Sequence, residues 1–390
     1  MGLSMYFPEH YEFFCPVKIN SGNRALEQMP FELDALNARK PFVMAGRDAS
    51  GRGLVDVIID AFKDSGIAIG IFDGVPVDPD LKLIRELFNT YRDKGYDSII
   101  AVGGGPVADT AKVLNVAVSG KPEDIEGCAG ENLVKRPLKP LIIVPTLSGT
   151  GYEVSRYAFF NGREYVSHFL MPHLAVIDPR MTLPEDSITT AATVLTALTH
   201  TVEAYTDFGK NPLADTYAYA AIQLIMEHLV NVIRDKGDGK GRLALANANA
   251  MAGCAFSNTA PGVAHKVGKI MGDMCHLPPG LCMGMLLPHI LEKQISEGGY
   301  HISDLLLPLA GFDAYASMAA DLRDRRAVDI LYDLLKELST ASGGAISRLW
   351  KDAQVSETTL QDVAQKAVGG GASSDMDGCM KILREAREGR

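Results

Sequence analysis

The segment from Gly262 to His289 combines side chains that can bind metal ions or stabilise charge during a reaction. It reads GVAHKVGKIMGDMCHLPPGLCMGMLLPH, and its histidines, cysteines and aspartate are common ligands of divalent metals. His265 and Lys269 are four residues apart, which places them on one face of a helix. An ammonium group beside a carbonyl oxygen can stabilise developing alkoxide charge as a metal ion would. The segment therefore indicates either a metal centre or a polar site that works without one.

A second candidate site is a run of three glycines, Gly103–Gly105. It lies in SIIAVGGGPVADTAK, directly after an apolar strand and before a predicted helix. Glycine allows a tight turn and close approach of backbone N–H groups to a phosphate, and the helix N-terminus adds partial positive charge. Pro106 suits the first helical turn, where its missing N–H costs nothing. The run predicts a phosphate-binding turn, with an ordinary βα turn as the alternative. Asp109 and Lys112 are then either site residues or a surface pair.

A third candidate is the hydroxyl-rich stretch IIVPTLSGTGYEVSR, which follows the next apolar strand along the chain. Ligands of open α/β sheets bind where the strands end. The stretch therefore predicts a second part of the same binding site, and a polar surface loop is the alternative. Its candidate residues are Thr146, Ser148, Gly149 and Thr150.

The composition indicates a protein that acts on a small molecule. A chain of 390 residues can form two domains, and its net charge of −10 disfavours a nucleic-acid partner. No apolar run reaches the roughly 20 residues that span a bilayer. The N-terminus lacks the pattern of a signal peptide, and the six cysteines include no CxxC pair. We therefore expect a cytoplasmic protein without a membrane partner.

The two halves of the chain show different periodicities. In the first half, short apolar runs alternate with amphipathic stretches, which indicates βαβ units and a parallel, Rossmann-like sheet. From about Ser187 onward the spacing becomes helical, as in TYAYAAIQLIMEHLVNVI. The sequence therefore predicts an α/β dinucleotide-binding domain at residues 1–185 and an α-helical domain at residues 186–390. The active site is expected in the cleft between them.

Six motifs, taken in their order and spacing, resemble those of the iron-containing (group III) alcohol dehydrogenase family. They are GGGPVADTAK, PTLSGTGYEVSR, DPRMTLP, TALTHTVEAYT, GCAFSNTAPGVAHKVG and PPGLCMGMLLPH. The resemblance implies the two-domain fold shared with dehydroquinate synthase, a nicotinamide cofactor, and hydride transfer between an alcohol and an aldehyde or ketone. It also implies a homodimer or a larger homo-oligomer. The family's phosphate-binding glycines match Gly103–Gly105, and its Thr-rich cofactor loop matches the stretch from Thr146 to Thr150.

The chain departs from this resemblance at the metal site. The family binds a divalent ion through an Asp and a His four residues apart on one helix, and through two later His. Those positions hold Thr196 and His200, then His265 and Pro279. A further family histidine, close to the substrate, is Lys269 here. Only His200 and His265 keep a metal-binding side chain, whereas a catalytic ion usually has three or more protein ligands.

Two interpretations of this departure compete. In one, a neighbouring side chain completes the ligand set for iron or zinc, the candidates being His276, Cys275 and Asp273. In the other, the metal is absent and Lys269 takes over its electrostatic role. The second is favoured because Pro279 occupies the ligand position and His276 lies three residues away. A purely structural alternative makes Lys269 a surface ion-pair partner and His200 a core histidine.

The end of the first predicted strand bears on the choice of cofactor. In the family an acidic residue there accepts the adenosine ribose hydroxyl groups, but FVMAGRDAS places Gly46 in that position, followed by Arg47. Losing a carboxylate and gaining a guanidinium group favours a 2′-phosphate. NADP(H) is therefore preferred and NAD(H) is possible, with Asp48 a neighbouring acid.

We expect a metal-independent, NADP(H)-linked enzyme that interconverts an alcohol with a small aldehyde, ketone or oxo-acid. The alternatives are a maleylacetate-reductase-like enzyme, a metal-dependent alcohol dehydrogenase with rebuilt ligands, a lyase like dehydroquinate synthase, and a non-catalytic nucleotide-binding protein. The substrate pocket is expected to be lined from the helical domain, with candidates Phe160, His168, Phe256 and Cys282.

Overall fold

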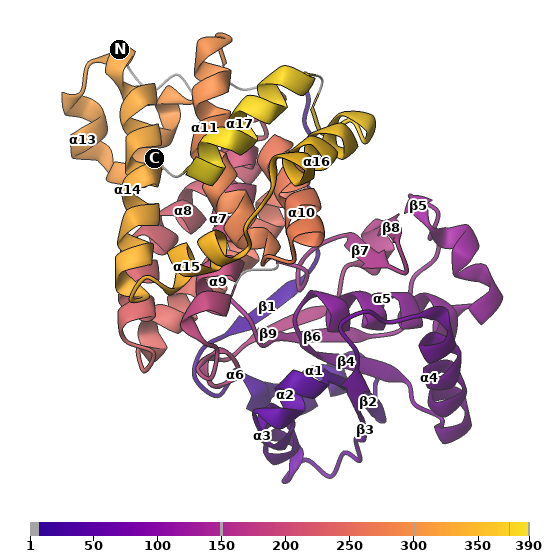
Figure 1. Ribbon diagram of the computed structural model, residues 1–390. Helices are drawn as coiled ribbons and strands as arrows, with labels where there is room; N and C mark the ends of the chain where they lie inside the picture. The colour runs from indigo at the N-terminus through magenta and orange to yellow at the C-terminus, as the bar shows by residue number, and fades with distance from the viewer. Residues whose placement is uncertain (1–7, 149–150, 300, 374, 389–390) are drawn as a thin grey trace. The chain divides into compact units, whose positions relative to one another are not determined.

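The computed structural model describes residues 8–388 apart from 149–150, 300 and 374. It forms two compact units that divide after Glu185 (Figure 1). The α/β unit comprises Cys15–Glu185. The helical unit comprises the chain from Asp186 onward together with the described residues 8–14.

The segment 8–14 thus differs from the predicted domain limits, which placed it with the α/β domain. Its attachment to the helical unit rests on specific contacts. Phe14 N donates to Asn258 Oδ1 at 2.7 Å, and Asn258 Nδ2 donates back to the Phe14 carbonyl oxygen at 3.2 Å. The ring of Phe13 stacks on Tyr217 with centroids 5.5 Å apart. These contacts join residues about two hundred positions apart, so sequence periodicity gives no sign of them.

A six-stranded parallel sheet forms the centre of the α/β unit, in the order β1-β9-β6-β4-β2-β3. The predicted α/β fold with a parallel sheet is therefore confirmed. Its strands are β1 (Lys18–Ser21), β2 (Pro41–Gly46), β3 (Gly70–Val75), β4 (Ser98–Gly103), β6 (Leu141–Pro145) and β9 (Leu174–Ile177). A separate three-stranded sheet contains β5 (Gly130–Glu131), β7 (Tyr157–Phe160) and β8 (Arg163–Val166).

Helices cover both faces of the six-stranded sheet. Phe42 and Met44 of β2 belong to the core cluster on the side of α4 and α5, whereas Val43 and Ala45 belong to the cluster on the side of α1 and α3. Because both faces are buried around the four inner strands, β9, β6, β4 and β2, these strands are continuous apolar runs instead of alternating ones. The helices of this unit are α1 (Met29–Ala35), α2 (Arg47–Gly51), α3 (Leu54–Phe62), α4 (Leu81–Lys94), α5 (Gly105–Ser119) and α6 (Pro179–Thr182).

The second unit is built from helices around one apolar core, as predicted. Asp186 begins α7 by accepting hydrogen bonds from Ile188 N at 2.9 Å and Thr189 N at 3.0 Å. The longer helices are α7 (Ser187–Tyr205), α8 (Pro212–Arg234), α9 (Gly239–Phe256), α10 (Val263–Cys275), α11 (Pro279–Ser296), α14 (Arg323–Ala341), α16 (Glu357–Gly369) and α17 (Met376–Glu388). The shorter ones are α12 (Leu306–Ala310), α13 (Phe312–Ser317) and α15 (Ala345–Asp352).

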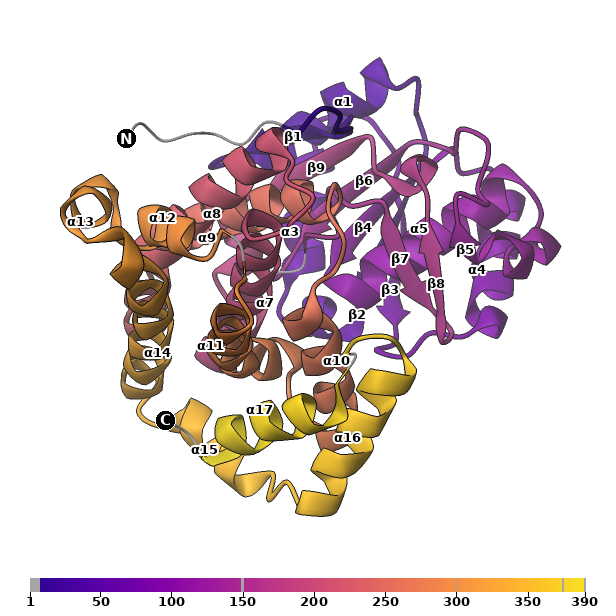
Figure 2. The same cartoon turned by 90° about the horizontal axis from the view of Figure 1, so that it is seen from above.

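The last helices of the chain close the helical core. Figure 2 shows α16 and α17 side by side, and α16 also contacts α10 while α17 contacts α11. The C-terminal segment therefore packs on the two helices that carry the Gly262–His289 stretch. None of the described helices is long and apolar enough to cross a membrane.

Candidate functional site

The three predicted phosphate-binding glycines lie where β4 ends and α5 begins. A Cβ atom on Gly103 would lie 2.6 Å from Val107 Cγ2, and one on Gly104 would lie 2.6 Å from Leu147 Cδ1. Side chains at these two positions therefore do not fit unless the neighbours shift, so the turn needs glycine there. No side chain caps the N-terminus of α5. The turn thus fits a phosphate group, which backbone N–H groups and the helix dipole can hold.

The hydroxyl-rich loop follows β6, the neighbour of β4 in the sheet. Gly103 is in register with Pro145, so both strands end at the same edge of the sheet. Thr146 and Ser148 are buried, and Ser148 Oγ has no hydrogen-bond partner within the described part of the chain. A buried hydroxyl group in this state fits a polar ligand that would satisfy it. Two further candidates lie outside the described residues: Gly149 and Thr150.

Asp109 and Lys112 are both buried on α5 and do not form a surface pair. Lys112 Nζ donates to the carbonyl oxygens of Ser155 and Tyr157, each at 2.8 Å. Burial lowers the pKa of Lys112 to about 8, while the charges of Asp109 and Glu153 oppose that shift. Lys112 therefore anchors the segment that follows the hydroxyl-rich loop, which makes it a positioning residue of this site.

Gly46 and Arg47 connect β2 to the short helix α2. Gly46 has an extended backbone, and a Cβ atom there would lie 3.3 Å from Val107 Cγ2 on α5. Arg47 and Asp48 are both exposed, and Asp48 pairs with Arg52 at 2.7 Å. The guanidinium group of Arg47 has no such carboxylate partner among the described residues. This strand end therefore carries an exposed positive charge where the family carries an acid.

In the helical unit, α7 and α10 bring His200 and His265 together. His200 Nε2 and His265 Nδ1 are 2.8 Å apart, and one of the two nitrogens donates a proton to the other. The ring of Phe256, from the end of α9, stacks on His200 with centroids 4.1 Å apart and an interplanar angle of 17°. The pair of imidazoles is thus fixed by a hydrogen bond and an aromatic contact.

Both imidazoles are held in the neutral form. Burial lowers the pKa of His200 well below its usual value, and the neighbouring His265 lowers it further. Burial also lowers the pKa of His265 to about 4, with additional effects from Lys269 and Lys266. Lys269 follows His265 by four residues on α10, about one helical turn, and its charge is among the causes that lower the pKa of His265.

The other two positions of the family's metal site hold no ligand. Thr196 Oγ1 donates to the carbonyl oxygen of Ala192 on its own helix at 3.1 Å. Pro279 is the first residue of α11 and is exposed. Gly280 follows so close to α7 that a Cβ atom on it would lie 2.3 Å from Thr196 Oγ1. The start of α11 therefore contacts the helix carrying Thr196 and His200.

The candidates for a rebuilt ligand set do not gather around the two histidines. His276 ends α10 in the left-handed conformation, at φ 55°, and is exposed, as is Asp273. Burial raises the pKa of Cys275, which disfavours its thiolate. Within the described residues, the one cluster of three possible metal ligands lies elsewhere, at His289, Glu292 and Glu385. Two imidazoles in mutual contact do not fit a catalytic divalent ion, which needs a third protein ligand.

Only part of the predicted substrate pocket comes from the helical unit. Phe256 contacts His200 and stays a candidate. Cys282 is buried in the helical core, and burial raises the pKa of its thiol to about 12. The prediction that the helical domain supplies Phe160 and His168 is wrong, because both belong to the α/β unit, and Phe160 lies in its core.

The sequence analysis missed Glu203, a buried carboxylate on α7. Its oxygens accept hydrogen bonds from three backbone N–H groups at the start of α10: Ala264 at 2.6 Å, Gly262 at 3.1 Å and His265 at 3.2 Å. Burial raises the pKa of Glu203 to about 7, against the effect of these donors. The sequence does carry a sign of this role, because Glu203 is an acidic residue three positions after His200 in an otherwise apolar helix. Glu203 sets the position of His265 relative to His200.

Comparison with known proteins agrees with these motifs over both units. A family model described as iron-containing alcohol dehydrogenase matches residues 16–179, and the model for the C-terminal part of the same family matches residues 190–376. The chain belongs to the iron-containing alcohol dehydrogenase family. It is accordingly an oxidoreductase acting on alcohols and aldehydes.

Individual relatives cover most of the chain. The 1,3-propanediol dehydrogenase of Klebsiella pneumoniae is 30% identical over 303 residues, which are 76% of this chain and 78% of the relative. The NAD-dependent methanol dehydrogenase of Bacillus methanolicus is 27% identical over 305 residues, 75% of this chain and 79% of that protein. The solved structure of an alcohol dehydrogenase from Oenococcus oeni has a TM-score of 0.87 at 25% identity, covering 97% of this chain and 100% of its own.

Replacing Glu203 tests its role as the anchor of α10. Glu203→Ala is expected to lower the free energy of unfolding by about 2–4 kcal/mol, because three N–H groups lose a charged acceptor. Glu203→Gln keeps one acceptor oxygen and should lose less. Urea unfolding at pH 8, above the pKa of Glu203, measures both. Glu227→Ala, at an exposed position of α8, is the control, and equal losses in Glu203→Ala and Glu227→Ala would contradict the anchoring role.

Proposed function

We propose that the chain is an NADP(H)-linked enzyme that interconverts an alcohol with an aldehyde or ketone and needs no divalent metal for this reaction. Residues 1–185 bind the dinucleotide, and residues 186–390 supply the side chains that act on the substrate. The observation that carries the proposal is the donor set on α7, α10 and α11. Two neutral imidazoles, those of His200 and His265, remain from the family's four ligands. The other two positions have no metal-binding side chain, and Lys269 lies one turn after His265.

The α/β unit carries the residues proposed for the cofactor. The phosphates are bound at Gly103–Gly105 and by the loop from Thr146 to Thr150, and Arg47 beside Gly46 takes the 2′-phosphate. Asp109 and Lys112 support this site from within α5. When bound, the nicotinamide supplies or accepts the hydride. The glycine turn, which has no room for a side chain at Gly103 or Gly104, and the unsatisfied hydroxyl of Ser148 support this assignment.

Lys269 is proposed to act on the substrate oxygen. In the direction of reduction, its ammonium group donates a hydrogen bond to the carbonyl oxygen and stabilises the negative charge that grows there. The same group then gives a proton to the alkoxide and recovers one from water, so the product is the neutral alcohol. His200 and His265 hold one side of this position with uncharged rings, which add no positive charge to compete with that of Lys269.

Two alternatives keep the same fold. A maleylacetate-reductase-like enzyme would reduce an unsaturated oxo-acid, whose carboxylate Lys269 could also attract. A metal-dependent alcohol dehydrogenase would need His276 to leave the left-handed position that ends α10. The exposed position of His276 on the far end of that helix favours the metal-free reaction.

The cofactor assignment makes a prediction about binding. Arg47→Ala is expected to weaken NADPH binding by about tenfold or more, the effect of losing one charge-assisted hydrogen bond, and to change NADH binding little. Fluorescence titration with both nucleotides measures this. Arg85→Ala, at an exposed position of α4, is the matched control. The assignment fails if NADH binds at least as tightly as NADPH and Arg47→Ala alters neither.

The role of Lys269 makes a prediction about turnover. Lys269→Met should lower kcat by about a hundredfold, as when one donor to a developing oxyanion is removed, while nucleotide affinity stays nearly constant. Lys266→Met removes an exposed charge from the same helix and should retain most of the activity. If both variants turn over like the parent protein, Lys269 has no part in the mechanism.

The proposed independence from metal makes a third prediction. Treatment with a strong chelator should leave the rate of NADPH-dependent aldehyde reduction unchanged, and added iron or zinc should not raise it, because His200 and His265 alone hold an ion weakly. The measurement is activity together with elemental analysis before and after chelation. Loss of activity on chelation, restored by one equivalent of metal per chain, would show a rebuilt ligand set.

A further inference from the structure

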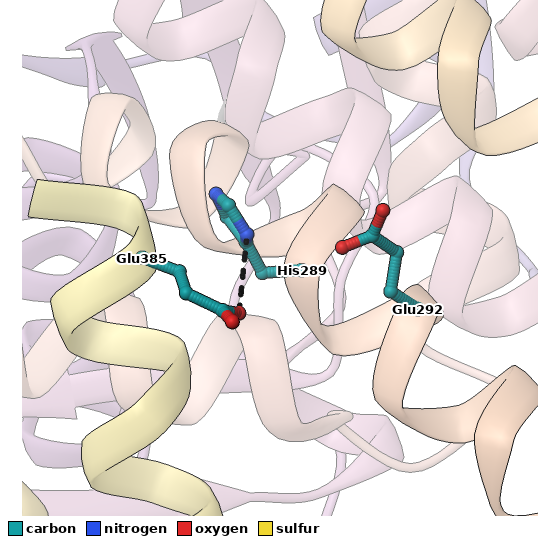
Figure 3. Close-up of side chains that lie close together, drawn as sticks. All are labelled: His289, Glu292 and Glu385. Carbon is teal, nitrogen blue, oxygen red and sulfur yellow. Dashed lines mark ion pairs between the residues drawn. The ribbon is translucent and has the colours of Figure 1, made fainter. Parts of the chain in front are cut away.

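A second group of chemically active side chains lies in the helical unit, away from the two histidines described above. It consists of His289 and Glu292 on α11 and Glu385 on α17. One ligand atom from each residue lies within 4.8 Å of the others. Figure 3 shows both carboxylate groups directed toward the imidazole of His289. None of these residues belongs to the family's ligand positions.

The imidazole lies at the centre of this cluster. His289 is buried, with 4% of its surface exposed, and its Nδ1 atom is 3.8 Å from Glu385 Oε2. Tyr332 of α14 places its hydroxyl oxygen 3.0 Å from the same nitrogen and 3.1 Å from Glu292 Oε2. Polar atoms from three helices therefore converge on His289 Nδ1.

The cluster is accessible from a pocket lined by both acidic and basic side chains. A pocket of about 400 Å³ is lined by all three residues, so an ion can reach them. Lys381 lies 3.9 Å from Glu385 but its side chain is 74% exposed, and such solvated pairs neutralise little charge. Lys293 on the pocket rim already pairs with Glu297 at 2.9 Å and with Asp375 at 3.3 Å. Glu292 and Glu385 thus both reach the pocket, whose lining also includes Arg325.

We propose that His289, Glu292 and Glu385 form a binding site for a divalent ion of the zinc type, which fastens α17 to α11. One imidazole and two carboxylates are a donor set that zinc accepts, whereas calcium and magnesium prefer oxygen ligands only. His289 and Glu292 are three residues apart, so they face the same side of α11. Metal–ligand distances of about 2.0–2.2 Å require the three groups to move slightly closer together, which side-chain rotations achieve at the edge of a pocket.

The proposed ion has a structural effect and no part in the redox reaction. Zinc binds the neutral imidazole of His289 through the Nδ1 lone pair, so it displaces any proton on that nitrogen. The hydroxyl group of Tyr332 then still donates its hydrogen bond to Glu292. Because α17 is the last described helix, a bridge from Glu385 to α11 would hold the end of the chain on the helical core. The proposal is independent of the cofactor and of Lys269.

The test measures where zinc binds and what it stabilises. Chelator-treated full-length protein is titrated with zinc chloride against a chromophoric chelator, and thermal unfolding is followed with and without zinc. We expect one equivalent to bind at this site and, at a zinc concentration about a hundredfold above Kd, the Tm to rise by about 3 °C. Glu385→Gln should weaken binding by about tenfold or more and remove most of that rise.

Matched variants separate this site from others. Glu388→Gln removes a charge from an exposed position of α17 and should bind zinc like the parent protein. His265→Ala should also keep this binding, and Glu292→Gln serves as a second ligand variant should Glu385→Gln fold poorly. The proposal is overturned if the parent binds no zinc, if both ligand variants bind it as the parent does, or if only His265→Ala loses it. In the first two cases the cluster is a hydrogen-bond network alone.

Discussion

The pairing of α7 with α10 around His200 and His265 depends on one buried contact, between the Glu203 carboxylate on α7 and the first N–H groups of α10. The N-terminus of a helix attracts an anion because its N–H groups lack internal partners. Here the anion comes from the helix that carries His200, so the same contact fixes the register of α7 against α10. His265 lies in the first turn of α10, where its Nδ1 atom is 2.8 Å from His200 Nε2. Lys269 lies one turn further along the same helix. A shift of α10 would therefore separate the imidazoles of His200 and His265 and would displace Lys269 at the same time.

The sequence predicted the parts of the fold that depend on local pattern. Continuous apolar runs gave the parallel sheet, and Gly103–Gly105 could be placed at a strand end because glycine and strand signals adjoin in the chain. It could not show that Lys112 is buried, because its partners at Ser155 and Tyr157 lie more than forty residues away. The contact between His200 and His265 likewise depends on how two helices pair. Family resemblance aligned those histidines, but only packing brings their rings together.

The residues that differ from the family's metal site can be compared with it by the net charge that each site carries. A dication with one aspartate ligand presents a net charge of +1 to a substrate oxygen. In the proposed metal-free site, Lys269 with the neutral Thr196 would present the same +1, because both imidazoles are uncharged. Retaining the aspartate without the ion would instead have left a carboxylate that opposes alkoxide formation. On this proposal, the residues at positions 196, 269 and 279 together keep the charge of the site unchanged.

The neutral imidazoles follow from the same balance. A second positive charge on His265 would repel Lys269 and would have to be buried beside Phe256, so burial and the lysine both act to lower the pKa of His265 to about 4. The hydrogen bond between the two rings also needs one nitrogen to accept, which an imidazolium pair cannot provide. Protonating both rings would thus break the contact that orients them, because neither facing nitrogen could then accept. In the proposed mechanism, a developing oxyanion would therefore meet the ammonium group of Lys269 on α10 and no second positive charge from the two imidazoles.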